Sequence, residues 1–258
     1  MHIDVRLGGD AAFDQLVAAC RDMGLQVMLD GVFNHVSRNH PAVQAALDET
    51  AGRLNPADNP WHGLVRAHVG DNGEPALDVF EGHGDLVALD HSADETVDYV
   101  VHVMSHWLDR GAAGWRLDAA YAVPSPFWAR VLPQVKAAHP YSWIFGEVIH
   151  GDYPRIIEES TMDSITQYEL WKSIQHALET ENFFELDWNL KRHNAFLDSF
   201  VPQTFIGNHD VTRIASQIGP AKAALALAVL MTVGGVPSIY YGDEQGYVGR
   251  QAGAFRRR

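Results

Sequence analysis

The segment Gly114-Trp-Arg-Leu-Asp118 places an arginine and a carboxylate at the end of a short run of apolar residues. Three further segments share this pattern of an apolar run that delivers a carboxylate, an imidazole or an amide: Asp30-Gly-Val-Phe-Asn-His35, Gly146-Glu-Val148 and Phe205-Ile-Gly-Asn-His-Asp210. Stretches with helical periodicity separate these segments. Parallel strands that alternate with helices present active-site groups at their carboxyl ends in this way. The sequence therefore predicts an α/β barrel enzyme.

The periodicity of the remaining chain agrees with this alternation. Phe13, Val17 and Cys20, for example, fall on one face of a helical pattern that stops at Gly24. We predict helices over residues 11–23, 95–110, 126–138 and 212–233, a largely helical stretch over 168–193, and strands over residues 26–30, 115–118, 142–147, 163–168, 204–207 and 238–241.

Residues 36–90 interrupt this alternation. They are rich in Asp, Asn, Gly, Pro and His, and Asn55-Pro56, Asn59-Pro60 and Asp71-Asn-Gly73 are turn signals. A loop of this length inside a compact domain needs structure of its own or a functional role. We therefore predict one catalytic domain over residues 1–258, with residues 36–90 inserted as a small subdomain over the mouth of the barrel.

The composition limits the classes of partner. The chain has 258 residues and a formal net charge of −14, which argues against nucleic acid or an anionic membrane surface. The single cysteine, Cys20, allows no disulfide within the chain. The most apolar stretch, residues 223–233, is too short to span a bilayer, and no signal peptide is visible at the N-terminus. We expect no membrane association, and a cytoplasmic location by default.

The residue types at the strand ends suit glycosidic bond hydrolysis. Arg116 and Asp118 are two residues apart, so strand alternation puts both on one face, and a neighbouring cation keeps a nucleophilic carboxylate ionised. Glu147 lies among apolar residues, which favour the protonated carboxyl of a general acid. Retaining hydrolysis needs two such carboxyl groups about 5 Å apart. We therefore predict Asp118 as nucleophile and Glu147 as general acid/base.

The segment Asn208-His209-Asp210 supplies further polar groups at the end of another strand. Asp210 is suited to supporting the positive charge that develops in an oxocarbenium-like transition state. We predict that His209, together with His35 and Arg116, holds the substrate.

Each of these groups has a simpler explanation when it is taken alone. Asp118 could cap a helix or only pair with Arg116, and Glu147 could be a solvated strand end. The segment 208–210 could be turn and cap chemistry before the next helix, and Asp30 could serve mainly to orient Arg116. A shared site explains the occurrence of all these groups at strand ends much better than chance does.

Metal-dependent hydrolysis is a further alternative to consider, because the chain has 14 histidines. His102 and His106 are four residues apart on a predicted helix, but no glutamate completes a His-Glu-x-x-His motif. A solvated or packed histidine pair explains this spacing better. We expect no metal ligands among the site residues.

The four segments together resemble the α-amylase family of retaining α-glucoside hydrolases and transglycosylases. Asp30-x-x-x-Asn-His35 is similar to the end of the family's third strand, and the segments ending at Asp118, after Glu147 and at Asp210 are similar to its fourth, fifth and seventh strands. The resemblance implies that Asp118 is the nucleophile, Glu147 the acid/base and Asp210 the transition-state stabiliser. Gly235-Val-Pro-Ser-Ile-Tyr-Tyr-Gly-Asp-Glu244 is similar to the eighth strand and its exit, and Leu86-Val-Ala-Leu-Asp90 lies where the family has another motif.

The resemblance implies a (β/α)8 TIM barrel of which strands three to eight are present. The chain is expected to be truncated at both ends, with the other barrel segments belonging to a full-length chain. The implied activity is hydrolysis, or transfer, of α-glucosidic bonds in α-glucans, maltooligosaccharides or related α-glucosides, through a covalent glycosyl-aspartate. The alternative is an inactive remnant that at most binds α-glucan.

The resemblance also raises the question of calcium. Some members of the family bind it through the position of Asn34, an acidic residue of the insertion and a carbonyl after the nucleophile strand. Here Ala119-Ala-Tyr121 lacks the Lys-His pair often found at that place. We therefore expect no cofactor.

Overall fold

The computed structural model of the protein describes residues 1–250. These residues form two compact units, each described below by itself. The first contains residues 1–147 and 159–162, and the second contains residues 148–158 together with the described residues from 163 to 250. No helix among the described residues combines the length and the apolar character that crossing a membrane requires.

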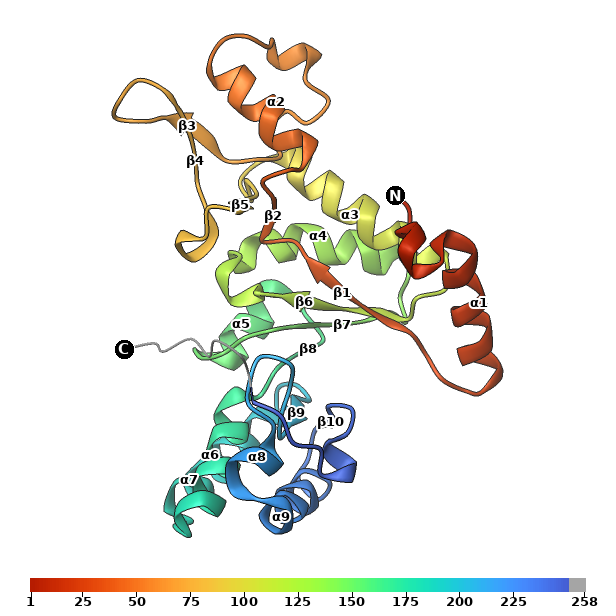
Figure 1. Ribbon diagram of the computed structural model, residues 1–258, viewed down its shortest axis with the longest axis vertical. Coiled ribbons are helices and arrows are strands. Elements are labelled where there is room, and N and C mark those ends of the chain that lie inside the picture. The colour runs from red at the N-terminus through yellow and green to blue at the C-terminus, as the bar shows by residue number, and fades with distance from the viewer. Residues whose placement is uncertain (251–258) are drawn as a thin grey trace. The chain divides into compact units, whose positions relative to one another are not determined.

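The first unit is built on three parallel strands, β1 (Met28–Val32), β6 (Gly114–Asp118) and β7 (Trp143–Gly146). Figure 1 shows these strands side by side. The helices that precede them in the chain are α1 (Gly9–Asp22), α3 (Asp94–Asp109) and α4 (Ser125–Ala138). The register pairs Asp30 with Arg116 and Arg116 with Phe145, so the polar strand ends lie at the same edge of the sheet.

Apolar periodicity explains why the helices pack as they do. Val97, Val100 and Met104 are buried at helical spacing on α3, which packs against α4. Phe33, just after β1, packs its ring against Trp115 of β6 and Trp128 of α4, with centroids 5.7 and 6.4 Å away. The predicted strand–helix alternation is therefore present in this unit, with ends within about two residues of those expected.

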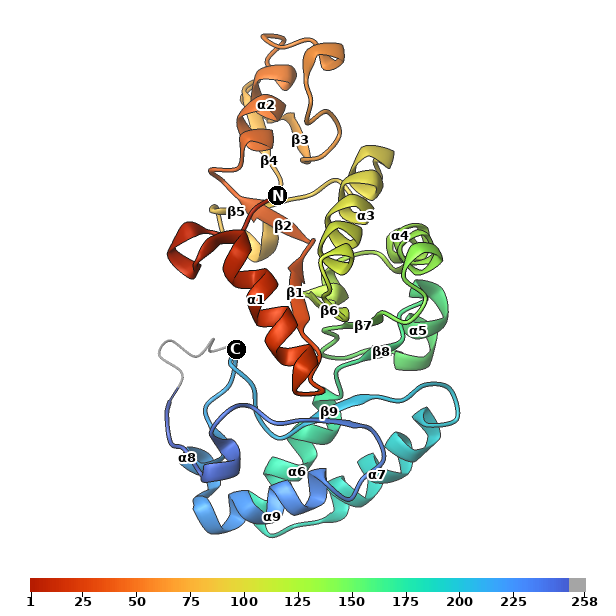
Figure 2. The same cartoon turned by 90° about the vertical axis from the view of Figure 1, so that its right-hand side faces the viewer.

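The insertion has secondary structure and a small core of its own. It contains α2 (Pro41–Thr50) and two antiparallel pairs, β2 (His35–Ser37) with β5 (Leu86–Ala88) and β3 (Ala67–Val69) with β4 (Pro75–Leu77). Val43, Leu64, Val87 and Leu89 are among its buried residues. Figure 2 shows α2, β3 and β4 projecting away from the three parallel strands. The sequence analysis did not predict α2. The description of residues 36–90 as a separate subdomain stays a prediction.

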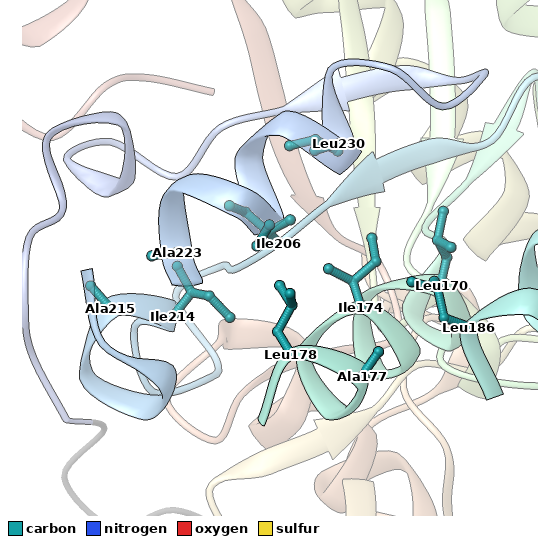
Figure 3. Close-up of a cluster of buried hydrophobic side chains, with 11 residues drawn as sticks. Leu170, Ile174, Ala177, Leu178, Leu186, Ile206, Ile214, Ala215, Ala223 and Leu230 are labelled. Carbon is teal, nitrogen blue, oxygen red and sulfur yellow. The ribbon is translucent and has the colours of Figure 1, made fainter. Parts of the chain in front are cut away.

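The second unit contains β8 (Ser164–Ile165), α6 (Tyr168–Thr180), α7 (Phe184–Phe196), β9 (Gln203–Phe205), α8 (Ile214–Ile218), α9 (Pro220–Leu230) and β10 (Val236–Ser238). β9 and β10 are parallel, and Thr166, just past β8, forms a parallel bridge to Gln203. A further helix, α5 (Tyr153–Ser160), lies between β7 and β8 in the chain and was not predicted. Figure 3 shows the core, in which Ile174, Leu178, Ile206 and Ile214 come together.

Backbone geometry explains where the predicted boundaries in this unit differ from the structure. The helical stretch 168–193 is divided at Glu181, which adopts left-handed φ of 59° at the end of α6. The stretch 212–233 is divided at Gly219, which has φ of 81° and is followed by Pro220 at the first position of α9. The predicted strand 238–241 was wrong beyond Ser238, because Tyr240 and Tyr241 turn to pack on the Arg213 guanidinium.

His193 of α7 is a buried histidine held in its neutral form. Its Nε2 lies 2.6 Å from the Gly234 carbonyl oxygen and its Nδ1 lies 3.5 Å from Gln167 Nε2. A carbonyl oxygen can only accept, so Nε2 donates to Gly234 and Nδ1 accepts from the Gln167 amide. Burial lowers the pKa of His193, although the Gly234 carbonyl acts in the opposite direction.

We expect protonation of His193 to destabilise the fold. Because its pKa in the folded protein lies below the ordinary 6.5, the unfolded chain takes up the proton first as the pH falls. The free energy of unfolding should therefore decrease as the pH drops below about 6.5, down to the folded pKa. Urea midpoints at pH 7.5 and 5.5 test this, with His193→Gln as the variant that keeps a donor for Gly234 but cannot titrate. An equal drop in both proteins would contradict the prediction.

Candidate active site

Arg116 is the centre of the polar cluster at the carboxyl ends of β1, β6 and β7. Its Nη1 lies 2.8 Å from Asp30 Oδ1 and 2.8 Å from Asp118 Oδ1, and its Nη2 lies 3.0 Å from Glu147 Oε2. Burial disfavours the charged guanidinium, but the hydrogen bond to Asp30 and the charges of the three carboxylates outweigh it and raise the pKa of Arg116. One permanently charged side chain thus holds a carboxylate from each of three neighbouring strands.

Glu147 follows β7 and is tied to the turn that follows β6. Its backbone N–H donates to the Leu117 carbonyl at 2.9 Å, and its carbonyl accepts from Tyr121 N–H at 3.1 Å. Its Oε2 accepts from Ala119 N–H at 3.0 Å, and its side chain is 9% exposed. Ala119 points its N–H toward this carboxylate from a left-handed conformation with φ of 46°.

The carboxylate of Glu147 has a more polar environment than its sequence neighbours predict. Ile144 and Val148 are fully buried, as the apolar run indicates. The carboxylate itself, however, meets the Arg116 guanidinium and the Ala119 amide. Tertiary contacts between adjacent strand ends, which no local pattern encodes, produce this difference.

His35, the first residue of β2, contacts the insertion and is close enough to Asp118 to interact with its charge. Its ring stacks on Phe80, with centroids 5.0 Å apart and an interplanar angle of 17°. Burial lowers the pKa of His35, the negative charge of Asp118 acts in the opposite direction, and His83 reinforces the lowering. The interaction with Asp118 places His35 at the edge of the same cluster, where the sequence predicted a substrate contact.

Tyr121 connects the insertion to the turn after Asp118, a contact that the sequence did not reveal. Its hydroxyl lies 3.1 Å from Glu81 Oε1, 40 residues away in the chain. Glu81 adopts left-handed φ of 47° within the short turn Phe80–Gly82. Such a conformation is costly for a residue with a side chain and is typical of functional sites. The only sequence signal is the position of Tyr121, three residues after Asp118.

The segment Asn208-His209-Asp210 lies after β9 in the second unit. Asn208 Nδ2 donates to the Tyr168 hydroxyl at 2.8 Å, and Asn208 Oδ1 accepts from Asp210 N–H at 3.0 Å. His209 Nε2 lies 3.4 Å from Asp210 Oδ1. The turn chemistry considered for this segment is therefore present at Asn208. The Asp210 carboxylate, in contrast, does not cap α8, whose N-cap residue is Arg213.

The structure thus brings Arg116, Asp118, Glu147 and His35 together in the first unit. Asp30, considered for orienting Arg116, bonds to it directly. His209 and Asp210 belong to the second unit, so their place in the same site stays a prediction.

Asn34 is the residue of this chain to which the question of calcium applies. Asn34 directs its Nδ2 to His35 Nδ1 at 3.2 Å and is buried. In residues 1–250, no three or more histidine, cysteine, aspartate or glutamate side chains are grouped in a way that could hold a metal ion. The expectation that the chain uses no cofactor stays a prediction.

A cation bonded to two carboxylates at the ends of parallel strands is consistent with a glycosidase of the α/β barrel class. The sequence model of the family described as alpha amylase, catalytic domain, matches residues 1–256. The chain therefore belongs to the α-amylase family, and the resemblance noted in the sequence is confirmed.

Curated relatives agree with this family. The chain is 29% identical over 259 residues to the maltogenic alpha-amylase of Bacillus acidopullulyticus, an alignment that covers 97% of this chain and 44% of the relative. It is 30% identical over 257 residues to a cyclomaltodextrinase of Bacillus sp, covering 96% of this chain and 45% of the relative. The chain thus spans less than half the length of these two enzymes.

Solved structures confirm the predicted fold class. The cyclic alpha-maltosyl-(1→6)-maltose hydrolase of Arthrobacter globiformis in its ligand-free form is similar with a TM-score of 0.82 and 26% identity, over 97% of this chain and 57% of that chain. The debranching enzyme of Nostoc punctiforme, soaked with acarbose, is similar with a TM-score of 0.78 and 26% identity, over 96% of this chain and 58% of that chain. The fold class is therefore that of the α/β barrel, and this chain matches part of such a barrel.

Proposed function

We propose that this chain carries the catalytic carboxylates of a retaining hydrolase, or transglycosylase, of α-glucosidic bonds. The observation that carries this proposal is the bonding of one guanidinium, Arg116, to both Asp118 and Glu147. Two carboxyl groups held at one guanidinium are neighbours, as the separation of about 5 Å in retaining glycosidases requires. Membership of the α-amylase family supports the same chemistry.

In the proposed first step, Asp118 attacks the anomeric carbon and forms a glycosyl ester, while Glu147 protonates the leaving oxygen. In the second step, Glu147 removes a proton from water or from a sugar hydroxyl, which displaces Asp118. Arg116 orients the nucleophile through its 2.8 Å contact to Asp118 Oδ1.

Asp210 is the proposed stabiliser of the oxocarbenium-like transition state, and His209 and His35 are proposed to hold sugar hydroxyls. The proposed substrates are α-glucans, maltooligosaccharides and related α-glucosides. The relatives named maltogenic alpha-amylase and cyclomaltodextrinase support this class of substrate.

We expect Asp118→Asn to reduce fluoride release from α-glucosyl fluoride on the order of 10³-fold or more, because the amide cannot form the glycosyl ester. Initial rates of release by the purified chain measure this effect. Asp48→Asn is the matched control, since the Asp48 side chain bonds Arg53 and Gln44 within the insertion and none of the proposed catalytic residues. Its rate should equal that of the parent chain.

A folded chain that releases no fluoride would contradict the proposed hydrolase. It would favour the second candidate, a remnant of an α-amylase-family enzyme that binds α-glucan without cleaving it. Equal rates for Asp118→Asn and the parent would instead exclude Asp118 as the nucleophile.

A further inference from the structure

A large pocket lies along α6 in the second unit, and none of the residues proposed to act in catalysis lines it. Its volume is about 970 Å³, within the range of small-ligand sites. Ile149 and His150, one side of α6 from Tyr168 to Glu179, and Glu185 of α7 line it. The opposite side of α6, with Ile174 and Leu178, faces the core in Figure 3.

Trp171 gives this pocket an aromatic platform. Phe205 stacks on the indole with centroids 6.0 Å apart and an interplanar angle of 17°, and Phe205 itself is buried. Tyr168 packs against Trp171 edge-on, at 5.8 Å and 84°. Because two buried rings fix the orientation of the half-buried indole, its remaining surface is presented to the pocket. Aromatic surfaces of this kind pack against the C–H faces of sugar rings.

The polar side chains of the pocket divide into paired and unpaired groups. Glu169 is bonded to Arg192 at 2.8 Å, and Glu185 to His176 at 2.5 Å. In the described part of the chain, Lys172, Gln175 and Glu179 form no side-chain hydrogen bond or ion pair, and all three point from the same helix as Trp171.

These unpaired groups indicate the charge of the ligand. Lys172 and Glu179 carry opposite charges, and Gln175 both donates and accepts hydrogen bonds. An anionic ligand would meet the Glu179 carboxylate, and a cationic ligand would meet the Lys172 ammonium. A neutral ligand with many hydroxyl groups can use all three.

We propose that this pocket is a binding site for a neutral oligosaccharide, with Trp171 stacking on a sugar ring and Lys172, Gln175 and Glu179 bonding its hydroxyls. The choice of a glucose oligomer rests on the proposed function, while the site and the neutral polyhydroxylated class of ligand rest on the pocket alone. The site would hold the substrate chain without taking part in bond cleavage.

Fluorine NMR of the 5-fluorotryptophan-labelled Asp118→Asn chain tests this site directly, because the variant should not consume the sugar. The chain has seven tryptophans, and the resonance lost in Trp171→Phe identifies Trp171. We expect maltoheptaose to shift this resonance in a saturable way. The internal control is Trp188, which is 60% exposed on α7 outside the pocket and is identified by Trp188→Phe. Its resonance should not shift.

Gln175→Ala should raise the Kd read from the Trp171 resonance at least threefold, since it removes a hydrogen-bonding group without touching the core. A Trp171 resonance that does not move, or that moves only as much as that of Trp188, would overturn the proposal. So would a saturable shift caused by inorganic phosphate and not by maltoheptaose.

Fluoride release measured on the parent chain separates this proposal from the proposed function. A Trp171 shift without fluoride release would retain the binding site and reject the hydrolase. Fluoride release without a Trp171 shift would retain the hydrolase and reject the binding site.

Discussion

Arg116→Ala is expected to abolish fluoride release and to lower the free energy of unfolding by about 3–5 kcal/mol. Removal of the guanidinium leaves the carboxylates of Asp30, Asp118 and Glu147 together without their shared cation. Most of the loss should come from Glu147, whose side chain is 9% exposed, because an unpaired charge costs most where water cannot reach it. Asp30 and Asp118 are more exposed and should contribute less.

Urea unfolding followed by circular dichroism measures the change in the free energy of unfolding. The initial rate of fluoride release measures the loss of activity. Arg116→Lys keeps the charge but cannot bond two carboxylates with a rigid fork, so it should recover more stability than activity. Asp30→Asn is the control that removes only the most exposed partner, and it should cost less than about 1 kcal/mol. If Arg116→Ala and Asp30→Asn unfold at the same urea concentration, the central role given to Arg116 is wrong.

The second large effect is expected at the buried ion pair of the second unit. Arg213 Nη1 lies 2.8 Å from Asp243 Oδ1, and the Asp243 side chain is 0% exposed. Arg213 also donates to the Tyr241 carbonyl at 2.9 Å and lies over the Tyr240 ring. Burial raises the pKa of the Asp243 carboxyl, and Arg213 opposes this effect. Arg213→Ala should therefore cost about 3–5 kcal/mol, because it leaves Asp243 buried without its cation.

Two comparisons make this prediction specific. Lys222→Ala breaks the exposed pair with Glu181 and should cost less than about 1 kcal/mol. The double variant Arg213→Met with Asp243→Leu removes both charges and should be more stable than Arg213→Ala, because no unpaired buried charge remains. A double variant as unstable as Arg213→Ala would show that lost packing around Tyr240, and not the uncompensated charge, causes the effect.

The alternation of side chains along a strand predicted the central contact of the candidate site in the first unit. The spacing of Arg116 and Asp118 placed both side chains on one face of β6, and the structure joins them at 2.8 Å. The surroundings of Glu147 were not predictable in the same way. They depend on the left-handed turn at Ala119 and on the parallel register of β6 and β7, and neither leaves a local signal in the sequence.

The differences in the fold have a similar origin. Periodicity identified the helical stretches 168–193 and 212–233, but single residues with positive φ, Glu181 and Gly219, divide them. Gly219-Pro220 was a readable signal for such a break. Glu181 was not, because glutamate favours helices and adopts this conformation only in its tertiary context. The contact between Glu81 and Tyr121 is likewise a product of tertiary structure, since it joins residues 40 positions apart.

The hydrogen bonds around Glu147 have a consequence for how such a chain can change during evolution. Leu117, Ala119 and Tyr121 each form a hydrogen bond with Glu147. These bonds between adjacent strand ends therefore set the distance between the two proposed catalytic carboxylates. The segment that runs from Ala119 through α4 to Glu147, which are 28 positions apart, does not set it. The turn at that segment's far end, where Tyr141 is 98% exposed, is therefore a place where insertions and exchanged loops can accumulate while the chemistry stays fixed.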